Sequence, residues 1–232
     1  MPNKRLKASG KKAVILLSGG LDSAVALYIA KRQGFKCHCL IFDYHQRHRR
    51  EIRSARAVAE SAGSPFEILK IPLPHKGSSL LDANLRLTTY LPAGQAGDLR
   101  LKGIPTTYVP GRNIIFLSFA LSFAETEGAS AIFIGAHVQD YSGYPDCRSE
   151  FYRDFRRVAK SGTKAGVEGR PIEICTPLIH KTKAQIIKMG KAMGVPFALT
   201  WSCYKGGRVP CGKCDSCYYR IKGFKEAGIK DI

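Results

Sequence analysis

The sequence predicts an α/β fold in which a parallel, Rossmann-like sheet is flanked by helices and followed by a small cysteine-rich C-terminal segment. The first observation is the apolar run 13–17, which is followed by a glycine turn and then by a helical pattern over 23–33. The second is the repetition of strand and helix patterns along most of the chain, which is typical of βαβ units. The third is a group of four cysteines between positions 203 and 217.

Four more strands are expected after the first one, because short apolar runs recur between turn residues. They are predicted over 36–42, 66–71, 131–134 and 171–175. Ligands of parallel sheets lie beyond the carboxyl ends of the strands, so we expect the connecting loops to converge on one crevice. These loops follow Leu17, Phe42, Ile71 and Ile134.

Three further helices follow from apolar spacing. The segment 49–62 carries apolar residues at helical spacing, from Ala55 to Ala62. The segment 114–125 is almost entirely apolar and is expected to be a helix buried on both sides. A last helix is predicted over 181–193, where Ile186, Met189 and Met193 share one side.

The chain divides into a main domain and two smaller segments. Residues 1–12 carry five Lys and Arg residues and are expected to be a flexible basic tail. Residues 13–200 form the α/β domain, and 201–232 form a metal-binding segment with a final helix. Within the domain, the stretch 72–105 is rich in proline and glycine and is predicted to be a long loop that serves as a lid or an interface.

Composition limits the class of protein. The hydrophobic fraction of 44% supports a real core, and the longest apolar run, 114–124, is too short to span a bilayer. With no targeting segment, we expect a cytoplasmic protein. The net charge of +19 indicates either polyanionic partners, such as nucleic acid or phosphorylated ligands, or a solubilising surface. The sequence does not indicate the oligomeric state, and a homodimer is one possibility.

The glycine turn after the first strand is predicted to bind phosphate. A helix N-terminus offers unpaired N–H groups, and Gly19 and Gly20 allow the backbone to approach an anion closely. Asp22 would repel phosphate unless a cation intervenes, which points to Mg²⁺. The Walker pattern and G-x-G-x-x-G are both absent. The expected nucleotide-binding residues are Leu17, Ser18, Gly19, Gly20, Leu21, Asp22 and Ser23.

The cysteine group has the composition of a metal site. Cys203, Cys211, Cys214 and Cys217 supply four thiols in a turn-rich segment, a set that suits tetrahedral Zn²⁺. Four sulfur ligands leave no open position, so the predicted zinc is structural. An iron–sulfur cluster is the chemical alternative.

Several blocks in their order resemble one known family. They are the SGGLDS turn 18–23, YHQRH at 44–48, YVPGRN at 108–113, GAH at 135–137, DYSGYPDCR at 140–148, TPL at 176–178, and SCY at 202–204 leading into CGKCDSC at 211–217. The turn is similar to that of N-type ATP pyrophosphatases, which share an adenine nucleotide alpha hydrolase-like fold. The whole set, from about Ala13 to Phe224, resembles the QueC family of 7-cyano-7-deazaguanine synthases. One departure is His45, where the family often has glycine.

The resemblance implies an ATP-dependent carbon–nitrogen ligase of queuosine precursor biosynthesis. Its substrates would be 7-carboxy-7-deazaguanine, ammonia and ATP, with Mg²⁺, and its product would be the nitrile. Catalytic roles are expected for Asp22, Ser23, Arg112 and Lys181. Substrate-binding roles are expected for Gln46, Arg47, Arg112, Asn113, His137, Asp140, Tyr144, Asp146 and Arg148. Capping, solvated or structural roles are the alternatives for Arg112, Asn113, Gln46, His137 and Lys181.

Two alternative functions can be compared with features of the sequence. A tRNA-modifying enzyme of the same superfamily would share the ATP turn and explain the charge, but a separate RNA-binding region is not apparent in the sequence. A zinc ribbon that binds nucleic acid would leave the ATP turn without a role.

Overall fold

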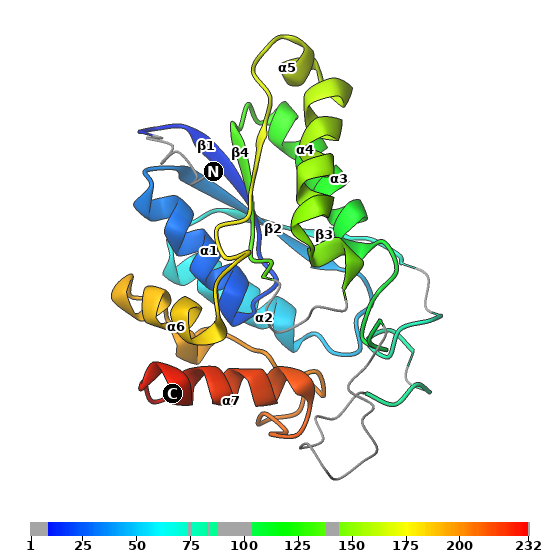
Figure 1. The fold of residues 1–232 in the computed structure, drawn as a ribbon, viewed down its shortest axis with the longest axis vertical. Coiled ribbons are helices and arrows are strands. Elements are labelled where there is room, and N and C mark those ends of the chain that lie inside the picture. Colours follow the sequence, from blue (N-terminus) through cyan, green and yellow to red (C-terminus); the bar gives the residue numbers. More distant parts are fainter. Residues whose placement is uncertain (1–8, 74–75, 83, 88–103, 138–143, 232) are drawn as a thin grey trace.

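The computed structural model describes residues 9–73, 76–82, 84–87, 104–137 and 144–231 (Figure 1). Most of the predicted basic tail, the centre of the predicted loop 72–105 and Asp140 lie outside the described residues. The described parts of the stretch 72–105 contain turns and bends and neither helix nor strand.

A single five-stranded parallel sheet forms the centre of the molecule, with strand order β3-β2-β1-β4-β5. This confirms the predicted sheet. The chain adds β2 and β3 on one side of β1 and then crosses back to add β4 and β5 on the other side. The strand order therefore reverses between the neighbouring strands β1 and β4. The strands are β1 (Lys12–Leu16), β2 (Lys36–Asp43), β3 (Phe66–Lys70), β4 (Ala131–Ile134) and β5 (Glu173–Cys175).

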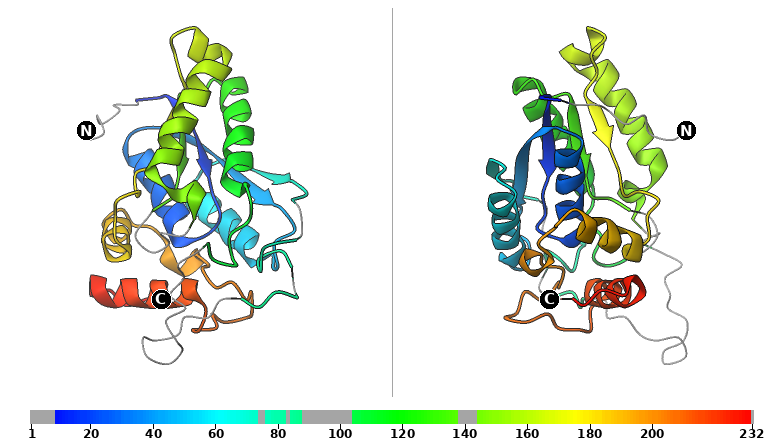
Figure 2. Two further views of the ribbon diagram at one scale, coloured as in Figure 1. Left: turned by 45° about the vertical axis from the view of Figure 1, so that its right-hand side comes forward. Right: turned by 90° about the vertical axis from the view of Figure 1, so that its left-hand side faces the viewer.

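Helices cover both faces of this sheet (Figures 1 and 2). One layer contains α1 (Leu21–Arg32), α2 (Arg50–Ser61) and α6 (Lys183–Ala192), with α7 (Asp215–Ala227) packed on α6. The other layer contains α3 (Arg112–Thr126) and α4 (Ser149–Gly162). Short helices also lie in the connecting segments: η1 (Pro145–Cys147) before α4, α5 (Lys164–Val167) after α4 and η2 (Phe197–Leu199) after α6.

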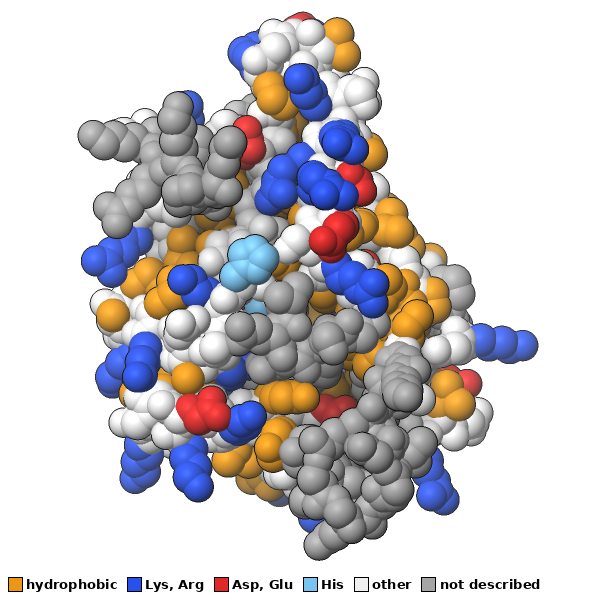
Figure 3. Space-filling model, in the orientation of Figure 1, with side chains coloured by type: hydrophobic (Ala, Val, Ile, Leu, Met, Phe, Trp, Pro, Cys, Tyr) orange, Lys and Arg blue, Asp and Glu red, His pale blue; other side chains and the backbone are white. Residues whose placement is uncertain are grey.

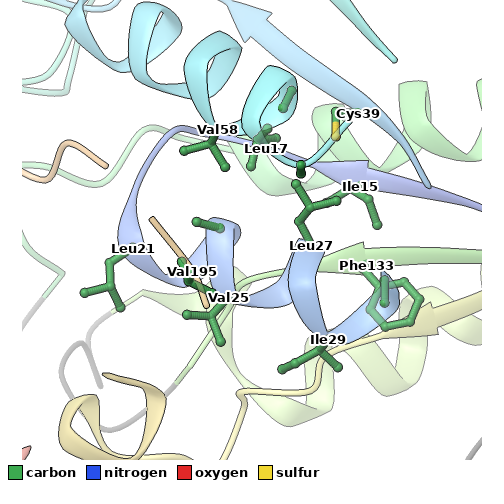
Figure 4. Close-up of a cluster of buried hydrophobic side chains, with 14 of the residues drawn as sticks. Ile15, Leu17, Leu21, Val25, Leu27, Ile29, Cys39, Val58, Phe133 and Val195 are labelled. Atoms are coloured by element: carbon green, nitrogen blue, oxygen red, sulfur yellow. The ribbon is translucent and has the colours of Figure 1, made fainter. Parts of the chain in front are cut away.

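Side-chain alternation along β1 divides the core into two clusters. Ala13 and Ile15 face the α1 layer, whereas Val14 and Leu16 face the α3 layer. Figure 4 shows the first cluster, in which Ile15 and other strand residues meet side chains of α1 and α2. A strand buried on both faces explains why β1 is one uninterrupted apolar run.

Helix α3 differs from its prediction. It was expected to be buried on both sides, but Ile114 and Phe119 are 50% and 46% exposed. The reason is that α3 lies in an outer layer and packs one face on the sheet, with Phe116 stacked on Phe42 at a centroid distance of 4.0 Å. Apolar composition alone did not reveal this one-sided burial.

Helix α4 was missed by the sequence prediction. Its pattern was nevertheless present, because Tyr152, Phe155 and Ala159 recur at helical spacing and are the buried residues of the helix. The neighbouring block 140–148 was interpreted only for its chemistry.

Basic side chains are distributed over the surface. On the face drawn in Figure 3, Lys and Arg side chains are scattered across several elements, with few acidic ones among them. Among the described helices, none combines the length and apolar character needed to cross a membrane.

Candidate active site

A cavity of about 280 Å³ opens beyond the carboxyl ends of β1, β2 and β4. Its floor includes Leu17 after β1, Phe42 in β2 and Gly135 after β4. The position lies at the reversal of strand order, where α/β sheets bind their ligands. The crevice expected from the sequence is therefore present.

The glycine turn that leads from β1 into α1 forms one wall. Gly19 has a φ of +82°, and a Cβ at this position would lie 2.3 Å from the carbonyl oxygen of Glu51. Only glycine tolerates both the left-handed backbone and this close approach of α2. Gly135 is constrained by space alone, since a Cβ at this position would lie 2.6 Å from the backbone nitrogen of Ser23.

Two serines hold the turn in shape. The Ser23 Oγ donates to the carbonyl oxygen of Gly20 at 3.0 Å and accepts from the Ser18 N–H at 3.2 Å. The Ser18 Oγ accepts from the Gly20 N–H at 3.3 Å and lies 3.0 Å from the Ser23 Oγ. The hydroxyls therefore order the turn itself, at the positive end of α1.

Asp22, Lys183 and His137 come together beside this turn. The Lys183 Nζ lies 2.9 Å from both carboxylate oxygens of Asp22 and 2.9 Å from the His137 Nε2. The His137 Nε2 is 3.4 Å from the Asp22 Oδ2. Burial opposes ionisation of Asp22, yet its pKa lies well below its usual range because Lys183 and His137 favour the carboxylate. The group is a partly buried, ionised carboxylate.

Lys183 lines the cavity, whereas the sequence analysis expected a catalytic role for Lys181. Both lysines precede the same apolar pattern, and the capping box of Thr182 and Gln185 starts α6 between them. The first turn of α6 then directs Lys183 to the cavity, whereas Lys181 is not among the lining residues. The capping-box pattern of Thr182 and Gln185 was the sequence signal that could have identified Lys183, because it shows that the helix begins at this residue.

Arg112 and Asn113 begin α3 on the opposite wall. The Arg112 guanidinium donates to the Tyr44 hydroxyl at 3.3 Å. Asn113 donates its backbone N–H to an Asp146 carboxylate oxygen and its side-chain amide to the Asp146 carbonyl, both at 3.2 Å. Asp146 is thus occupied in holding the start of α3 and does not line the cavity, and Arg148 is an exposed residue at the start of α4.

Gln46 and Arg47 line the cavity, but their polar groups also shape its rim. The Gln46 amide bridges the Tyr44 N–H at 2.9 Å and the Phe42 carbonyl at 3.3 Å. The Arg47 guanidinium donates to the carbonyl of Ser79 at 3.2 Å, so it fastens part of the predicted loop to the site. Leu80 of this loop lines the cavity.

The four predicted cysteines converge on one point. Their Sγ atoms all lie within 4.8 Å of one another. Four sulfurs around a tetrahedral ion at about 2.3 Å would be separated by about 3.8 Å, close to the 3.9 Å between Cys211 and Cys217. Backbone N–H groups also point at the sulfurs, including those of Lys205 and Cys211 on Cys203. This arrangement could hold a metal ion, and the residues fit the predicted site.

Trp201 connects this cluster to the glycine turn. Its backbone N–H donates to the Gly19 carbonyl at 2.9 Å, and its indole N–H donates to the Cys203 carbonyl at 2.8 Å. Arg50 covers the ring at 4.2 Å and donates to the Gly207 carbonyl at 3.3 Å. The cysteine segment is therefore part of the cavity wall rather than a separate appendage.

Most of the residues predicted for the site line one cavity. They are Leu17, Ser18, Gly20, Leu21, Asp22, Ser23, Gln46, Arg47, Arg112, Asn113, His137 and Tyr144. Gly19 supports the turn from behind. The lining also includes polar and aromatic residues that the sequence analysis did not select, among them Tyr44, Glu51, Cys147, Lys183, Trp201, Tyr204 and Arg220.

Comparison with known proteins identifies relatives that match nearly the whole chain. Residues 12–228 match the family described as queuosine biosynthesis protein QueC. The 7-cyano-7-deazaguanine synthase of Nostoc sp. strain PCC 7120 is 50% identical over 222 residues, 95% of each chain. That of Desulfatibacillum aliphaticivorans is 53% identical over 225 residues, again 95% of each chain.

Solved structures show the same fold at low identity. NMN synthetase from Francisella tularensis has a TM-score of 0.50 and 15% identity, covering 95% of this chain and 78% of its own. A 4-thiouridine synthetase, solved with RNA and bound ATP, has a TM-score of 0.53 and 19% identity, covering 94% of this chain and 50% of its own. The family match over residues 12–228 and the relatives that are about half identical to the chain show that it belongs to the QueC family.

Proposed function

We propose that this protein converts 7-carboxy-7-deazaguanine and ammonia to 7-cyano-7-deazaguanine at the expense of ATP. The observation that carries the proposal is the cavity at the strand ends, where the glycine turn meets Asp22, Lys183 and His137. Relatives about half identical to the chain are 7-cyano-7-deazaguanine synthases, and their name supplies the product and so the substrate class.

The reaction needs two activations because a carboxylate is a poor electrophile. Its oxygen attacks the α-phosphorus of ATP, pyrophosphate leaves, and a mixed anhydride with AMP forms. Ammonia displaces AMP and gives the amide. The amide oxygen is then adenylated in its turn, and loss of AMP and a proton gives the nitrile. In each of the two adenylations the outer phosphates depart as pyrophosphate, so an anion site for them is required.

The chain's own residues suit these tasks. The turn from Ser18 to Ser23 presents the N-terminus of α1 to the outer phosphates. Lys183 can turn from Asp22 toward a phosphate as charge develops on pyrophosphate. Arg112 on the opposite wall is a planar donor for the substrate carboxylate or the α-phosphate. Substrate roles for Tyr144, Asn113 and His137 belong to the same proposal, while Asp146 and Arg148 would act only through the start of α3 and α4.

Two metal ions belong to the proposal. Asp22 is held ionised, as a Mg²⁺ ligand must be, and its oxygens face Lys183, which the ion would replace. Mg²⁺ would neutralise the departing pyrophosphate. Zn²⁺ in the four-cysteine cluster would be structural, and the absence of an iron–sulfur absorption band in purified protein would separate it from the alternative.

The test is incubation with ATP, Mg²⁺, ammonium and 7-carboxy-7-deazaguanine, followed by mass measurement of the base. The expected product is the nitrile, with two AMP released per molecule. Release of AMP without change of the base would contradict the proposal and indicate another acceptor. The alternative, a tRNA-modifying enzyme, is favoured only by the charge of +19.

A further inference from the structure

Glu51 is a carboxylate of the cavity that the chemistry above does not use. It lies in the first turn of α2, its carbonyl oxygen packs against Gly19, and its side chain lines the cavity. Throughout the described part of the chain, its carboxylate has no hydrogen bond and no ion pair. Asp22, the other carboxylate among the described lining residues, is fully engaged by Lys183 and His137.

The remaining charges of the lining are positive. Arg47, Arg112, Lys183 and Arg220 suit phosphates and a substrate carboxylate, and they repel a small cation. Among the described lining residues, Glu51 is therefore the position where a small cation would be stabilised.

One substrate of the proposed reaction is such a cation. Ammonia in neutral solution is almost entirely ammonium, which has no lone pair and cannot attack an acyl adenylate. The proton must be removed where the nucleophile is used, and the acceptor must be unprotonated a fair fraction of the time near pH 7. Burial raises the pKa of Glu51 to about 7, with Arg112 opposing the rise.

We propose that Glu51 forms the ammonium site of this enzyme, an assignment that rests on the proposed function. The carboxylate binds ammonium, takes one of its protons and frees the nitrogen lone pair. The nitrogen then forms a bond to the adenylate carbonyl carbon, while the carbon–oxygen bond to AMP breaks and AMP leaves with the electron pair. The second proton is lost to water from the new C–N group, and Glu51 returns its own proton to solvent.

Other titratable and charged groups share the cavity with Glu51 and set its environment. They are Asp22 of α1, Tyr44, Arg47 and His48 of the loop after β2, Arg112 of α3, His137 after β4, Tyr144 and Cys147 around η1, Lys183 of α6, and Tyr204, Tyr219 and Arg220 of the C-terminal segment. The pKa of Asp22 is far below neutrality, and burial raises that of Tyr44 above its ordinary value. Neither group can serve as the acceptor near pH 7.

The test compares Glu51→Gln with the wild type in three assays. The first is ATP–pyrophosphate exchange with 7-carboxy-7-deazaguanine alone, which reports adenylation. The second is nitrile formation with ammonium chloride. The third replaces ammonium with hydroxylamine, which is largely unprotonated at neutral pH and traps the adenylate as a hydroxamate. Glu60→Gln, on the same helix but with its side chain 59% exposed, is the matched control.

In Glu51→Gln, we expect exchange and hydroxamate formation to persist, while turnover with ammonium falls about 10²–10⁴-fold. Glu51→Asp should recover part of this loss, and Glu60→Gln should resemble the wild type. The assignment fails if the variant keeps ammonium turnover, or if exchange and trapping are lost together with it. Wild type that catalyses neither exchange nor nitrile formation would instead overturn the proposed function, and the assignment with it.

Discussion

At the residue scale, the site depends on how each charge is neutralised. The Lys183 Nζ lies 2.9 Å from both carboxylate oxygens of Asp22. Lys183 belongs to α6, which is distant from Asp22 in the sequence. Glu51 faces the cavity without such a neighbour among the described residues. The two carboxylates have opposite pKa shifts because Lys183 and His137 lie in direct contact with Asp22 and outweigh the effect of burial there, whereas Arg112 only partly opposes that effect at Glu51.

The choice between Lys183 and Lys181 can be tested directly. In Lys183→Ala the outer phosphates lose a cation and Asp22 loses its partner, so we expect the rate of AMP release to fall about 10²-fold or more. Lys181→Ala removes a lysine outside the cavity lining and should retain wild-type AMP release. The reverse ranking of the two variants would restore the sequence-based choice of Lys181.

Glu51 also has a consequence for stability. Its folded pKa of about 7 lies above its usual value of 4.5, so the folded state binds the proton more tightly than the unfolded state. The resulting cost is absent below pH 4.5, grows between 4.5 and 7, and is complete above 7. The free energy of unfolding of Glu51→Gln should therefore exceed that of the wild type by about 1–3 kcal/mol at pH 8. At pH 4.5 the two values should be equal. Urea unfolding at both pH values measures the difference, and an equal gain at both would contradict it.

His45 has the backbone conformation for which glycine is suited. Its φ is +61°, in the left-handed region, at the turn between β2 and α2. We expect His45→Gly to be as stable as wild type or up to about 1 kcal/mol more stable, because glycine removes the strain but has more freedom when unfolded. His45→Val should be destabilised, since a branched side chain fits this region poorly. Thermal unfolding of the pair is the measurement, and a stable valine variant would be inconsistent with the turn.

At the element scale, the cysteine segment and the glycine turn act as one unit. Trp201 is bonded to Gly19 on one side and to Cys203 on the other, and Gly206 packs on His48, where a Cβ would lie 2.1 Å from the His48 Cγ. Loss of the metal would release the segment that supports the turn. We therefore expect metal loss to weaken nucleotide binding, although the metal and the nucleotide would not be in contact.

The single tryptophan makes this coupling measurable. Its side chain is buried, so chelation of the metal should shift its emission to longer wavelength and weaken ATP binding in parallel. Cys214→Ser should show the same shift and lose metal. Cys175→Ser, in β5 and outside the cluster, should retain both metal and emission. A variant that lost metal but bound ATP with wild-type affinity would disprove the coupling.

The elements themselves were predictable to different degrees. Strands β1, β2 and β4 could be predicted because their apolar runs record burial on both faces, and α2 because its apolar residues share one face. Helix α3 could not be predicted in full, since its apolar composition does not say which face meets the sheet. Its exposed Ile114 and Phe119 depend on what packs around the helix.

At the scale of the whole molecule, the charge of +19 has two interpretations. If it serves a solubilising surface, tRNA and an unrelated RNA of equal length should bind weakly and alike, with affinity falling steeply as salt rises. Fluorescence anisotropy at two salt concentrations measures this. Selective binding of tRNA that survives physiological salt would favour the tRNA-modifying alternative, and the scattered cations in Figure 3 would then mark its surface.

The sequence by itself determined the parallel sheet, the glycine turn after β1 and the four-cysteine cluster. Each depends on residues that are close in sequence, such as the apolar run before Gly19 or the spacing from Cys211 to Cys217. Because such residues are also close in the folded chain, their arrangement can be predicted from local patterns. Only the tertiary structure decided that Lys183 rather than Lys181 reaches Asp22, that Asp146 holds a helix start, and that Glu51 faces the cavity. These side chains come from elements whose positions depend on packing across the sheet, which no local pattern records.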